Sequence, residues 1–124
     1  MKRDLDLVRA ILITAESSDG PVGEAVLLSL DSDADKIAYH LELMCARGLV
    51  VADVSYDGFG RTPIDMELLS LTWEGYDYLD AIRSAKVWSK AKESMTAAIG
   101  DVSLSLAKET CLMVARQLIA KQIS

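Results

Sequence analysis

Apolar residues recur at helical spacing over the first part of the chain. The residues that share this apolar face are Leu5, Val8, Ile11, Leu12 and Ala15. Asp4 and Asp6 place negative charge where the positive end of a helix dipole would lie, and Gly20-Pro21 interrupts the pattern. Spacings of three and four positions are typical of one buried helix face. The pattern therefore predicts a first helix over residues 4–17.

Two different patterns follow. The segment EAVLLSL, residues 24–30, is rich in β-compatible residues but equally fits a helical turn, and we expect a short strand there. The next apolar stripe consists of Ile37, Leu41, Met44 and Cys45. Ser32 is a suitable N-cap for this stripe, and Gly48 is typical of a helix end. These features predict a second helix over 33–47.

Two β-compatible segments lie on either side of the loop YDGFGRTP. They are LVVADVS at 49–55 and IDMELLSLT at 64–72. The loop contains several turn-forming residues, namely Asp57, Gly58, Gly60 and Pro63. Together the segments predict a β-hairpin with a flexible tip.

The remainder of the chain has helical periodicity. Thr72 is a suitable cap for a helix in which Tyr76, Leu79 and Ile82 share a face. The apolar pattern continues to about residue 99 through Val87, Trp88, Ala91, Met95 and Ala98. Gly100-Asp101 interrupts it, and a last amphipathic helix follows. Its apolar positions are Leu104, Ala107, Cys111, Val114, Ala115 and Leu118.

The order of these elements is helix, short strand, helix, two-stranded hairpin, then helices. It predicts an α+β fold, a winged-helix-like domain with two added C-terminal helices. We expect residues 1–86 to form the winged-helix-like body. Residues 87–124 are expected to form a C-terminal helical extension that packs on the body or on a second subunit. Winged-helix proteins commonly dimerise through terminal helices, so by analogy we expect a homodimer.

Three segments also resemble a known family. MKRDLDLVRAIL, IAYHLELMCARGLV and LTWEGYDYLDAIRSAKVWSKAK occur here in the order seen in a family of uncharacterised domains found largely in bacteriophages and prophages. The resemblance covers nearly the whole chain, and the C-terminal helix is its least diagnostic part. It implies a winged-helix-like fold and a phage or prophage origin, and it implies no activity.

Charge is unevenly distributed along this chain of net charge −6. Residues 1–48 carry five Lys/Arg and nine Asp/Glu, and residues 49–86 carry three and seven. Residues 87–124 carry five Lys/Arg and three Asp/Glu. An acidic body offers no general attraction to duplex DNA, although a local basic patch can still bind it.

The cellular setting is predicted from what the chain lacks. Its first residues are charged, and no uncharged apolar run approaches the roughly 20 residues that span a bilayer. Cys45 and Cys111 lie far apart in sequence, with no CxxC spacing, so we expect reduced thiols. We therefore expect a cytoplasmic protein that does not bind membranes.

Groups suited to catalysis are scarce. His40 is the only histidine, so no multi-histidine metal site and no Ser-His or Cys-His arrangement with a spare base can be assembled, and we expect this residue at a helix surface or edge. Asp31, Asp33 and Asp35 lack the glycine and the distal glutamate of a calcium loop, and more simply charge a helix N-terminus. We therefore expect no enzyme activity, no metal and no cofactor.

The helix over 33–47 is the candidate binding element. The leading hypothesis is a DNA-binding regulator, with candidate contacts at Lys36, Tyr39, His40, Arg47 and Arg61. Against it, Asp35 and Glu42 on the same face would oppose phosphate. The alternative is an acidic protein-interaction module that binds and inhibits or modulates a host or defence protein. Its candidate contacts form an apolar strip of Tyr39, Leu43 and Ala46.

The stretch LTWEGYDYLDAIR gathers Trp73, Tyr76 and Tyr78 within six positions. Such a cluster is either a binding site or a packing device. Thr72 would cap a helix where the second hairpin strand ends, which would set Trp73 and Tyr76 against aliphatic side chains of the first helix. Burying each ring would contribute about 1.5–3 kcal/mol. We therefore expect the cluster to fasten the C-terminal helices to the body.

Overall fold

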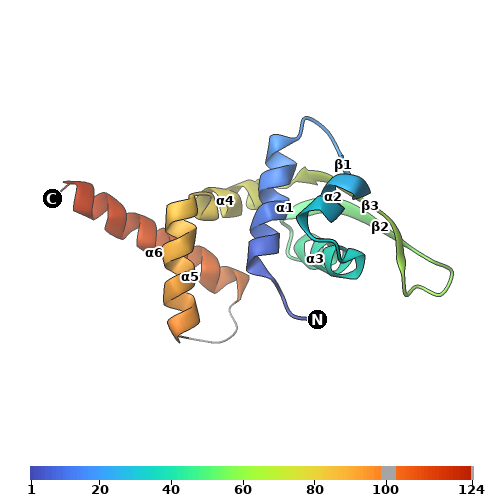
Figure 1. The fold of residues 1–124 in the computed structure, drawn as a ribbon. Coiled ribbons are helices and arrows are strands. Elements are labelled where there is room, and N and C mark those ends of the chain that lie inside the picture. The colour runs from blue at the N-terminus through green and yellow to red at the C-terminus, as the bar shows by residue number, and fades with distance from the viewer. Residues whose placement is uncertain (99–102, 124) are drawn as a thin grey trace. The chain divides into compact units, whose positions relative to one another are not determined.

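The computed structural model describes residues 1–98 and 103–123, which form a mixed α+β structure (Figure 1). The helices are α1 Leu5–Ser17, α2 Glu24–Leu30, α3 Ala34–Ala46, α4 Trp73–Ile82, α5 Ala85–Ala98 and α6 Leu104–Ile123. The strands are β1 Val22–Gly23, β2 Val50–Tyr56 and β3 Pro63–Leu71. The chain divides into two compact units, Met1–Asp77 and Tyr78–Ser124, hereafter the first and the second unit. The sequence places a boundary further along, after residue 86.

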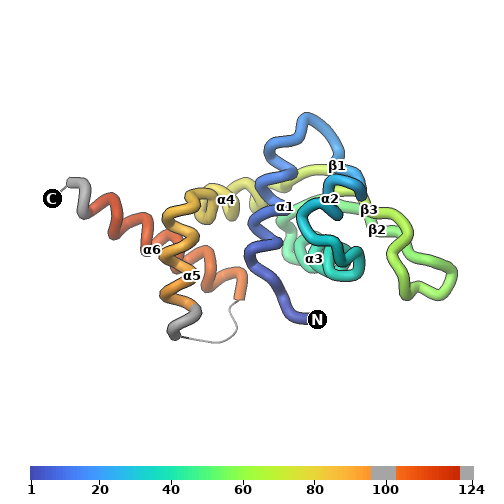
Figure 2. Tube along the Cα trace, in the orientation of Figure 1, coloured from blue at the N-terminus to red at the C-terminus, as the bar shows by residue number. Residues whose placement is uncertain are grey.

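A three-stranded antiparallel sheet with strand order β1-β3-β2 organises the first unit. The central strand β3 pairs with both neighbours, and Leu68 lies opposite Val22 on one side and Ala52 on the other. Val50, Met66 and Leu68 are buried, and both α1 and α3 contact the sheet. The β2–β3 hairpin extends past the ends of α2 and α3 (Figure 2). This arrangement is compatible with a winged-helix-like fold.

Helix α1 forms where the apolar pattern predicts it. Asp4 caps the helix, because its Oδ1 accepts the N–H of Leu7 at 3.1 Å. The buried residues of α1 are Leu7, Val8, Ile11 and Leu12. The predicted helix over 4–17 is therefore confirmed to within one residue.

Residues 24–30 form helix α2, so the expected strand over this segment is wrong. The strand in this region is β1, where Val22 and Gly23 occupy the pairing positions opposite Leu68 and Glu67 of β3. Glu24 then carries negative charge in the first turn of α2, which suits the helix dipole. Leu27 is the one fully buried residue of α2, so a single turn anchors the helix. A segment with one anchor gives little periodicity by which to separate helix from strand.

Helix α3 matches the predicted second helix, but Asp33 rather than Ser32 is its N-cap. Asp33 Oδ1 accepts the N–H of Lys36 at 3.2 Å. At the other end Gly48 has φ of 80°, a left-handed conformation that favours glycine. The Leu49 N–H then donates to the Met44 carbonyl at 2.9 Å, which satisfies the end of the helix.

The second unit is formed by α5 and α6 together with the last turns of α4. The residues buried in it include Val87, Trp88, Ala91 and Met95 of α5, and Leu104, Ala107, Cys111 and Val114 of α6. Ser84 separates α4 from α5, because its Oγ accepts the N–H of Val87. The predicted break at Gly100-Asp101 lies outside the described residues. None of the helices in the described part of the chain is long and apolar enough to cross a membrane.

The aromatic cluster of α4 is not the packing device that the sequence predicts. Trp73 is 80% exposed and Tyr76 is 46% exposed, whereas Tyr78 is buried and its hydroxyl donates to the Leu104 carbonyl at 2.6 Å. The expected burial of Trp73 and Tyr76 is therefore wrong. The small residues Thr72 and Gly75 fasten the start of α4 instead.

Thr72 and Gly75 hold the start of α4 against Gly48 and Leu49, which lie between α3 and β2. Thr72 Oγ1 donates to the Gly48 carbonyl and accepts the N–H of Gly75, so Thr72 is the cap that the sequence predicts. The Thr72 N–H donates to the Leu49 carbonyl at 3.0 Å. A Cβ on Gly75 would lie 2.0 Å from the oxygen of that same carbonyl. Only glycine allows this close approach of backbone to backbone.

Candidate interaction surface

Lys36, a predicted DNA contact, is held by two carboxylates. Its Nζ donates to Asp31 Oδ2 and to Asp4 Oδ2, each at 2.9 Å. These bonds, first that to Asp31, raise the pKa of Lys36. The bond from Lys36 lowers the pKa of Asp31. Partial burial acts to raise the pKa of Asp4, but the bonds from Lys36 and from the Leu7 N–H outweigh it and the pKa is lowered.

His40 lies in the core, so the expectation of a surface or edge histidine is wrong. Its side chain is fully buried. The Asp4 N–H donates to Nε2 at 2.8 Å, and Nδ1 lies 2.8 Å from the Lys36 carbonyl oxygen. Because Nε2 accepts a hydrogen bond, the ring is neutral and Nδ1 carries the proton that it donates to this carbonyl. His40 therefore ties the start of α1 to α3 and presents no nitrogen to a ligand.

The solvent side of α3 is acidic and partly apolar. Asp35 and Glu42 are exposed. The predicted strip lies beside them: Tyr39 and Leu43 are half-buried, and Ala46 is exposed. The structure thus brings the three strip residues onto one side of the helix, next to two carboxylates. We call these five residues the α3 surface.

Strand β2 extends the α3 surface. The Tyr56 hydroxyl donates to Glu42 Oε1, which joins the hairpin to α3. This bond raises the pKa of Tyr56 to about 12, because ionisation would bring two negative charges together. A cleft of about 320 Å³ lies beside it, lined by Leu41, Glu42, Cys45, Ala52, Asp53 and Val54. Asp53 adds a further carboxylate, so the potential here favours a cation.

The loop between β2 and β3, residues 57–62, is organised by Asp57. Its Oδ1 accepts the backbone N–H groups of Arg61, Phe59 and Thr62 at 3.0, 3.2 and 3.4 Å. These bonds, first that from Arg61, lower the pKa of Asp57. The loop holds Phe59 at 87% exposure beside an exposed Arg61. Sequence reasoning missed Phe59, although Asp57 followed by two glycines is a signal for such an ordered turn.

The predicted nucleic-acid contacts do not gather in one patch. Lys36 lies in the first turn of α3, and Arg47 is exposed at its C-terminal end, about 16 Å away along the helix axis. Arg61 belongs to the hairpin loop. Tyr39 lies on the α3 surface, and His40 is buried. The α3 helix therefore presents carboxylates where a DNA-reading helix would present cations.

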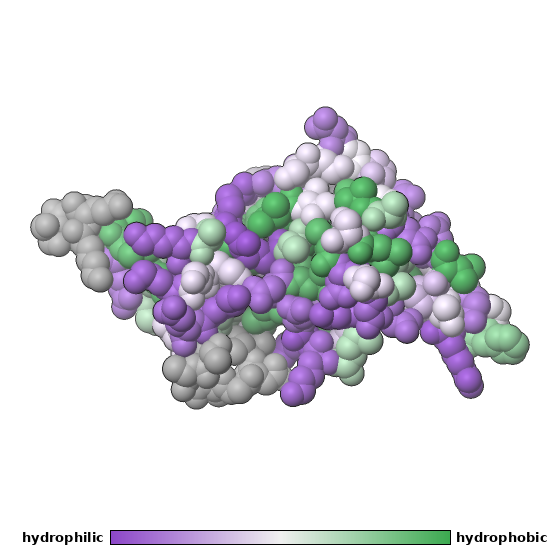
Figure 3. Space-filling model, viewed as in Figure 1, coloured by the Kyte–Doolittle hydropathy of each residue, from purple (hydrophilic) through white to green (hydrophobic). Residues whose placement is uncertain are grey.

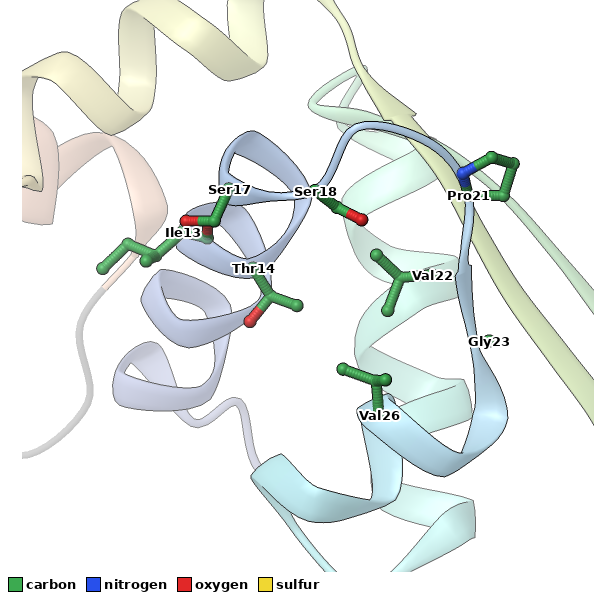
Figure 4. A pocket seen from close by; sticks show the side chains of 8 residues that line it. All are labelled: Ile13, Thr14, Ser17, Ser18, Pro21, Val22, Gly23 and Val26. Carbon is green, nitrogen blue, oxygen red and sulfur yellow. The ribbon is translucent and has the colours of Figure 1, made fainter.

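A second hollow, of about 360 Å³, lies between α1 and the start of α2 (Figure 4). It is lined by Ile13, Thr14, Ser17, Ser18, Pro21, Val22, Gly23 and Val26. Thr14, Val22 and Val26 point toward one another there (Figure 4). The Thr14 and Ser17 hydroxyls donate to backbone carbonyls of α1. Because no lining residue is ionisable, the hollow offers no acid, base or metal ligand.

The described residues also show no group of three or more His, Cys, Asp or Glu side chains placed to hold a metal ion. Cys45 and Cys111 are free thiols, as expected. Cys111 is buried, and the Cys45 Sγ lies 3.7 Å from the Ala52 carbonyl oxygen.

The two units differ in charge. The first contains six Lys/Arg and fifteen Asp/Glu, and the second contains seven and four. On the face drawn in Figure 3, hydrophobic residues interrupt the hydrophilic surface over α1 and α2. The excess of carboxylates in the first unit makes a positively charged partner the electrostatically favoured one.

Comparison with known proteins identifies relatives. A family model described as "Hypothetical protein (DUF2513)" matches residues 2–100. An uncharacterized protein of Haemophilus influenzae is 31% identical over 121 residues, which cover 97% of this chain and 100% of that protein. No solved structure matches the chain. Neither description names an activity, so function has to be argued from the surface itself.

Proposed function

The chain belongs to the DUF2513 family, and we propose that it is a non-enzymatic protein-interaction module with a winged-helix-like body. In this proposal the α3 surface binds a basic surface of a partner protein. The partner class is the host or defence protein of the alternative hypothesis, and the phage or prophage origin implied by the resemblance stays a prediction.

The observation that carries this proposal is the charge of the α3 surface. The one lysine of α3 forms ion pairs with Asp4 and Asp31, while the carboxylates of Asp35 and Glu42 are exposed. A helix that enters the major groove needs cations toward phosphate, because binding to DNA is driven largely by release of counterions. Carboxylates beside a partly exposed tyrosine and leucine fit a basic protein surface better.

Tyr56 supports the same proposal. Its hydroxyl holds the Glu42 carboxylate in one orientation and links α3 to the hairpin. A fixed carboxylate loses less side-chain entropy on binding than a mobile one. The surface is therefore organised before a partner arrives.

Two charge variants test the proposal. Asp35→Asn with Glu42→Gln removes two charges from the α3 surface with little change in shape, and Asp19→Asn with Asp65→Asn is the matched control at exposed positions elsewhere. Tagged wild type and both variants are used to capture proteins from host lysate, and each recovered protein is quantified. We expect a basic partner that the wild type and the control retain and the α3 variant loses. Recovery of chaperones alone, or equal recovery by all three, contradicts the proposal.

Duplex DNA is the second candidate, and the hairpin loop is the observation that favours it. Arg61 is exposed next to Phe59 on a loop that Asp57 holds in place. Binding to mixed genomic duplex fragments is measured across a salt series for wild type and Arg61→Ala. Affinity that falls steeply with salt and drops in the variant supports DNA binding, and absence of binding at low salt excludes it.

Homodimerisation through the C-terminal helices also stays a prediction. Leu112, Met113 and Ile119 of α6 are 37%, 58% and 55% exposed. Size exclusion with light scattering measures the mass directly. A monomer mass at all concentrations would contradict the expected dimer.

A further inference from the structure

The first turns of α4 carry an exposed aromatic pair beside a carboxylate. Trp73 is 80% exposed, Tyr76 is 46% exposed, and Asp77 is exposed. Tyr76 and Asp77 follow Trp73 by three and four positions, so the three side chains lie on one side of the helix. All three belong to the first unit. We call them the α4 surface.

The backbone beneath the α4 surface is fixed without help from its side chains. Thr72 caps α4 and bonds to the Gly48 carbonyl, and Gly75 packs directly on Leu49. Trp73 is therefore not needed to hold the helix in place. An exposed tryptophan on a fixed backbone is an anchor of the kind that dominates binding energy at protein interfaces.

We propose that Trp73, Tyr76 and Asp77 form a subsite for a Lys or Arg side chain within a cationic segment of a partner protein. A cation over the face of an indole or phenol ring is attracted by the negative charge of the π face. Asp77, on the same side of the helix, supplies the opposite charge. Within the described residues no lysine or arginine side chain pairs with Asp77, so its charge remains available. The inference deepens the proposed function and rests on it for the class of partner.

The chemistry of α4 favours a basic peptide over nucleic acid. Nucleic-acid bases also stack on aromatic rings, but such sites need cations to hold the phosphates. The sequence of α4, WEGYDYLDAI, contains no lysine or arginine, and its first turns contain Glu74 and Asp77. The acidic excess of the first unit acts in the same direction. A cationic polypeptide satisfies the rings and the carboxylates together.

The test uses the indole N–H signals of the full-length chain. The protein contains two tryptophans, Trp73 on the surface and Trp88 in the core at 5% exposure, and the Trp73→Ala variant assigns the two signals. Octa-arginine and octa-lysine are titrated in at low salt, with octa-glutamate as the control probe. We expect saturable movement of the Trp73 signal with the cationic peptides and none with octa-glutamate.

Ring chemistry separates this subsite from general attraction to an acidic protein. Trp73→Leu keeps apolar area but removes the ring, and should weaken peptide binding about two- to fivefold, whereas Trp73→Phe should retain most of the affinity. Asp77→Asn should weaken binding to a similar degree. Phe59→Ala, which removes another exposed ring from the hairpin loop, is the matched control and should leave the affinity unchanged.

Several results would overturn the proposal. They are an unmoved Trp73 signal, equal affinity of the leucine and phenylalanine variants, or an equal loss in Phe59→Ala. A larger shift with duplex DNA than with the cationic peptides would identify nucleic acid as the occupant. A shift that depends on protein concentration alone would identify a second copy of the chain. Because the α3 charge variant keeps Trp73, failure of the α3 surface and failure of the α4 surface give different results.

Discussion

The α3 helix and the start of α4 reverse the roles that their sequences suggest. His40 and Lys36 of α3 are predicted to reach outward to a ligand, yet one is buried and the other is held by two carboxylates. Trp73 and Tyr76 of α4 are predicted to pack inward, yet both are exposed. A backbone contact accounts for His40 and for the start of α4, whereas side-chain carboxylates hold Lys36.

These backbone contacts involve polar groups and small residues, which the spacing of apolar residues does not reveal. The Asp4 N–H needs an acceptor, and His40 Nε2 supplies it. The Leu49 carbonyl lies against the first turn of α4 at the position of Gly75, which has no side chain. Small residues and backbone polar groups therefore set which way a helix faces, and large side chains occupy the directions that remain.

The largest expected effect is that of Gly75→Ala. The added Cβ would lie 2.0 Å from the Leu49 oxygen, so the first turn of α4 has to shift away from Leu49. We expect a loss of unfolding free energy of about 3 kcal/mol or more, measured by urea denaturation. Gly58→Ala is the control, because a Cβ there meets nothing within 4 Å, and should change stability by less than about 0.5 kcal/mol. Similar losses of stability in the two variants would show that the close contact of Gly75 with Leu49 does not hold α4 in place.

His40→Leu is expected to have the next largest effect. The substitution leaves the partly buried Asp4 N–H without its acceptor, and the Lys36 carbonyl keeps only its bond within the helix. A buried donor without an acceptor costs about 1–3 kcal/mol, so we expect a loss of about 1–3 kcal/mol in urea denaturation. The exposed control on the same helix is Asp35→Asn, which should remain within about 0.5 kcal/mol of wild type. A stable His40→Leu protein would mean that the histidine is not a structural link.

Lys36→Met tests, through the pH dependence of stability, whether the two carboxylates hold Lys36. The pKa values of Asp4 and Asp31 are lowered from 3.8, so their stabilising effect is present above that pH and is lost as pH falls through the folded-state values. The pKa of Lys36 is raised from 10.5, so its effect is present below that pH and is lost as pH rises further. Wild type should therefore be more stable than the variant by a constant amount from about pH 5 to 10. This difference in stability should be smaller than that of His40→Leu, and it should shrink below and above this pH range.

Thermal unfolding across pH measures this difference. Lys2→Met, at another exposed lysine, is the control and should lack this pH profile. The advantage of wild type over Lys36→Met should also fall in high salt, because the pairs are partly exposed. A difference that is independent of pH would show that Lys36 acts through packing of its methylenes.

Much of the fold is predictable from this sequence because its strongest signals are local. Asp4 and Asp6 as charges at a helix start, Thr72 as a cap and Gly48 as a helix end each follow from rules that act within a few residues. Helix α2 was not predicted, because its one buried residue, Leu27, gives no repeating spacing of apolar positions.

The α3 surface is less predictable because its surroundings depend on residues far along the chain. The strip residues were found by helical spacing, since Tyr39, Leu43 and Ala46 share a face whatever packs around them. The pairing of Lys36 with Asp4 joins positions 32 residues apart, and no local pattern indicates it. The exposure of Phe59 follows from the turn that Asp57 organises, and the sequence signal for that turn does not say which side chain it exposes.

Trp73→Ala has the smallest expected effect on stability and gives the clearest test of the reversal between α3 and α4. A buried tryptophan replaced by alanine costs about 3–5 kcal/mol, and Trp88→Ala is expected to show such a loss. An indole that is 80% exposed gives up little apolar contact, so we expect Trp73→Ala to remain within about 0.5 kcal/mol of wild type in urea denaturation. A loss near that of Trp88→Ala would restore the packing interpretation and remove the anchor from the α4 surface. If the variant is stable, any loss of peptide binding in it reports the missing ring, because the backbone contacts of Thr72 and Gly75 still hold the helix.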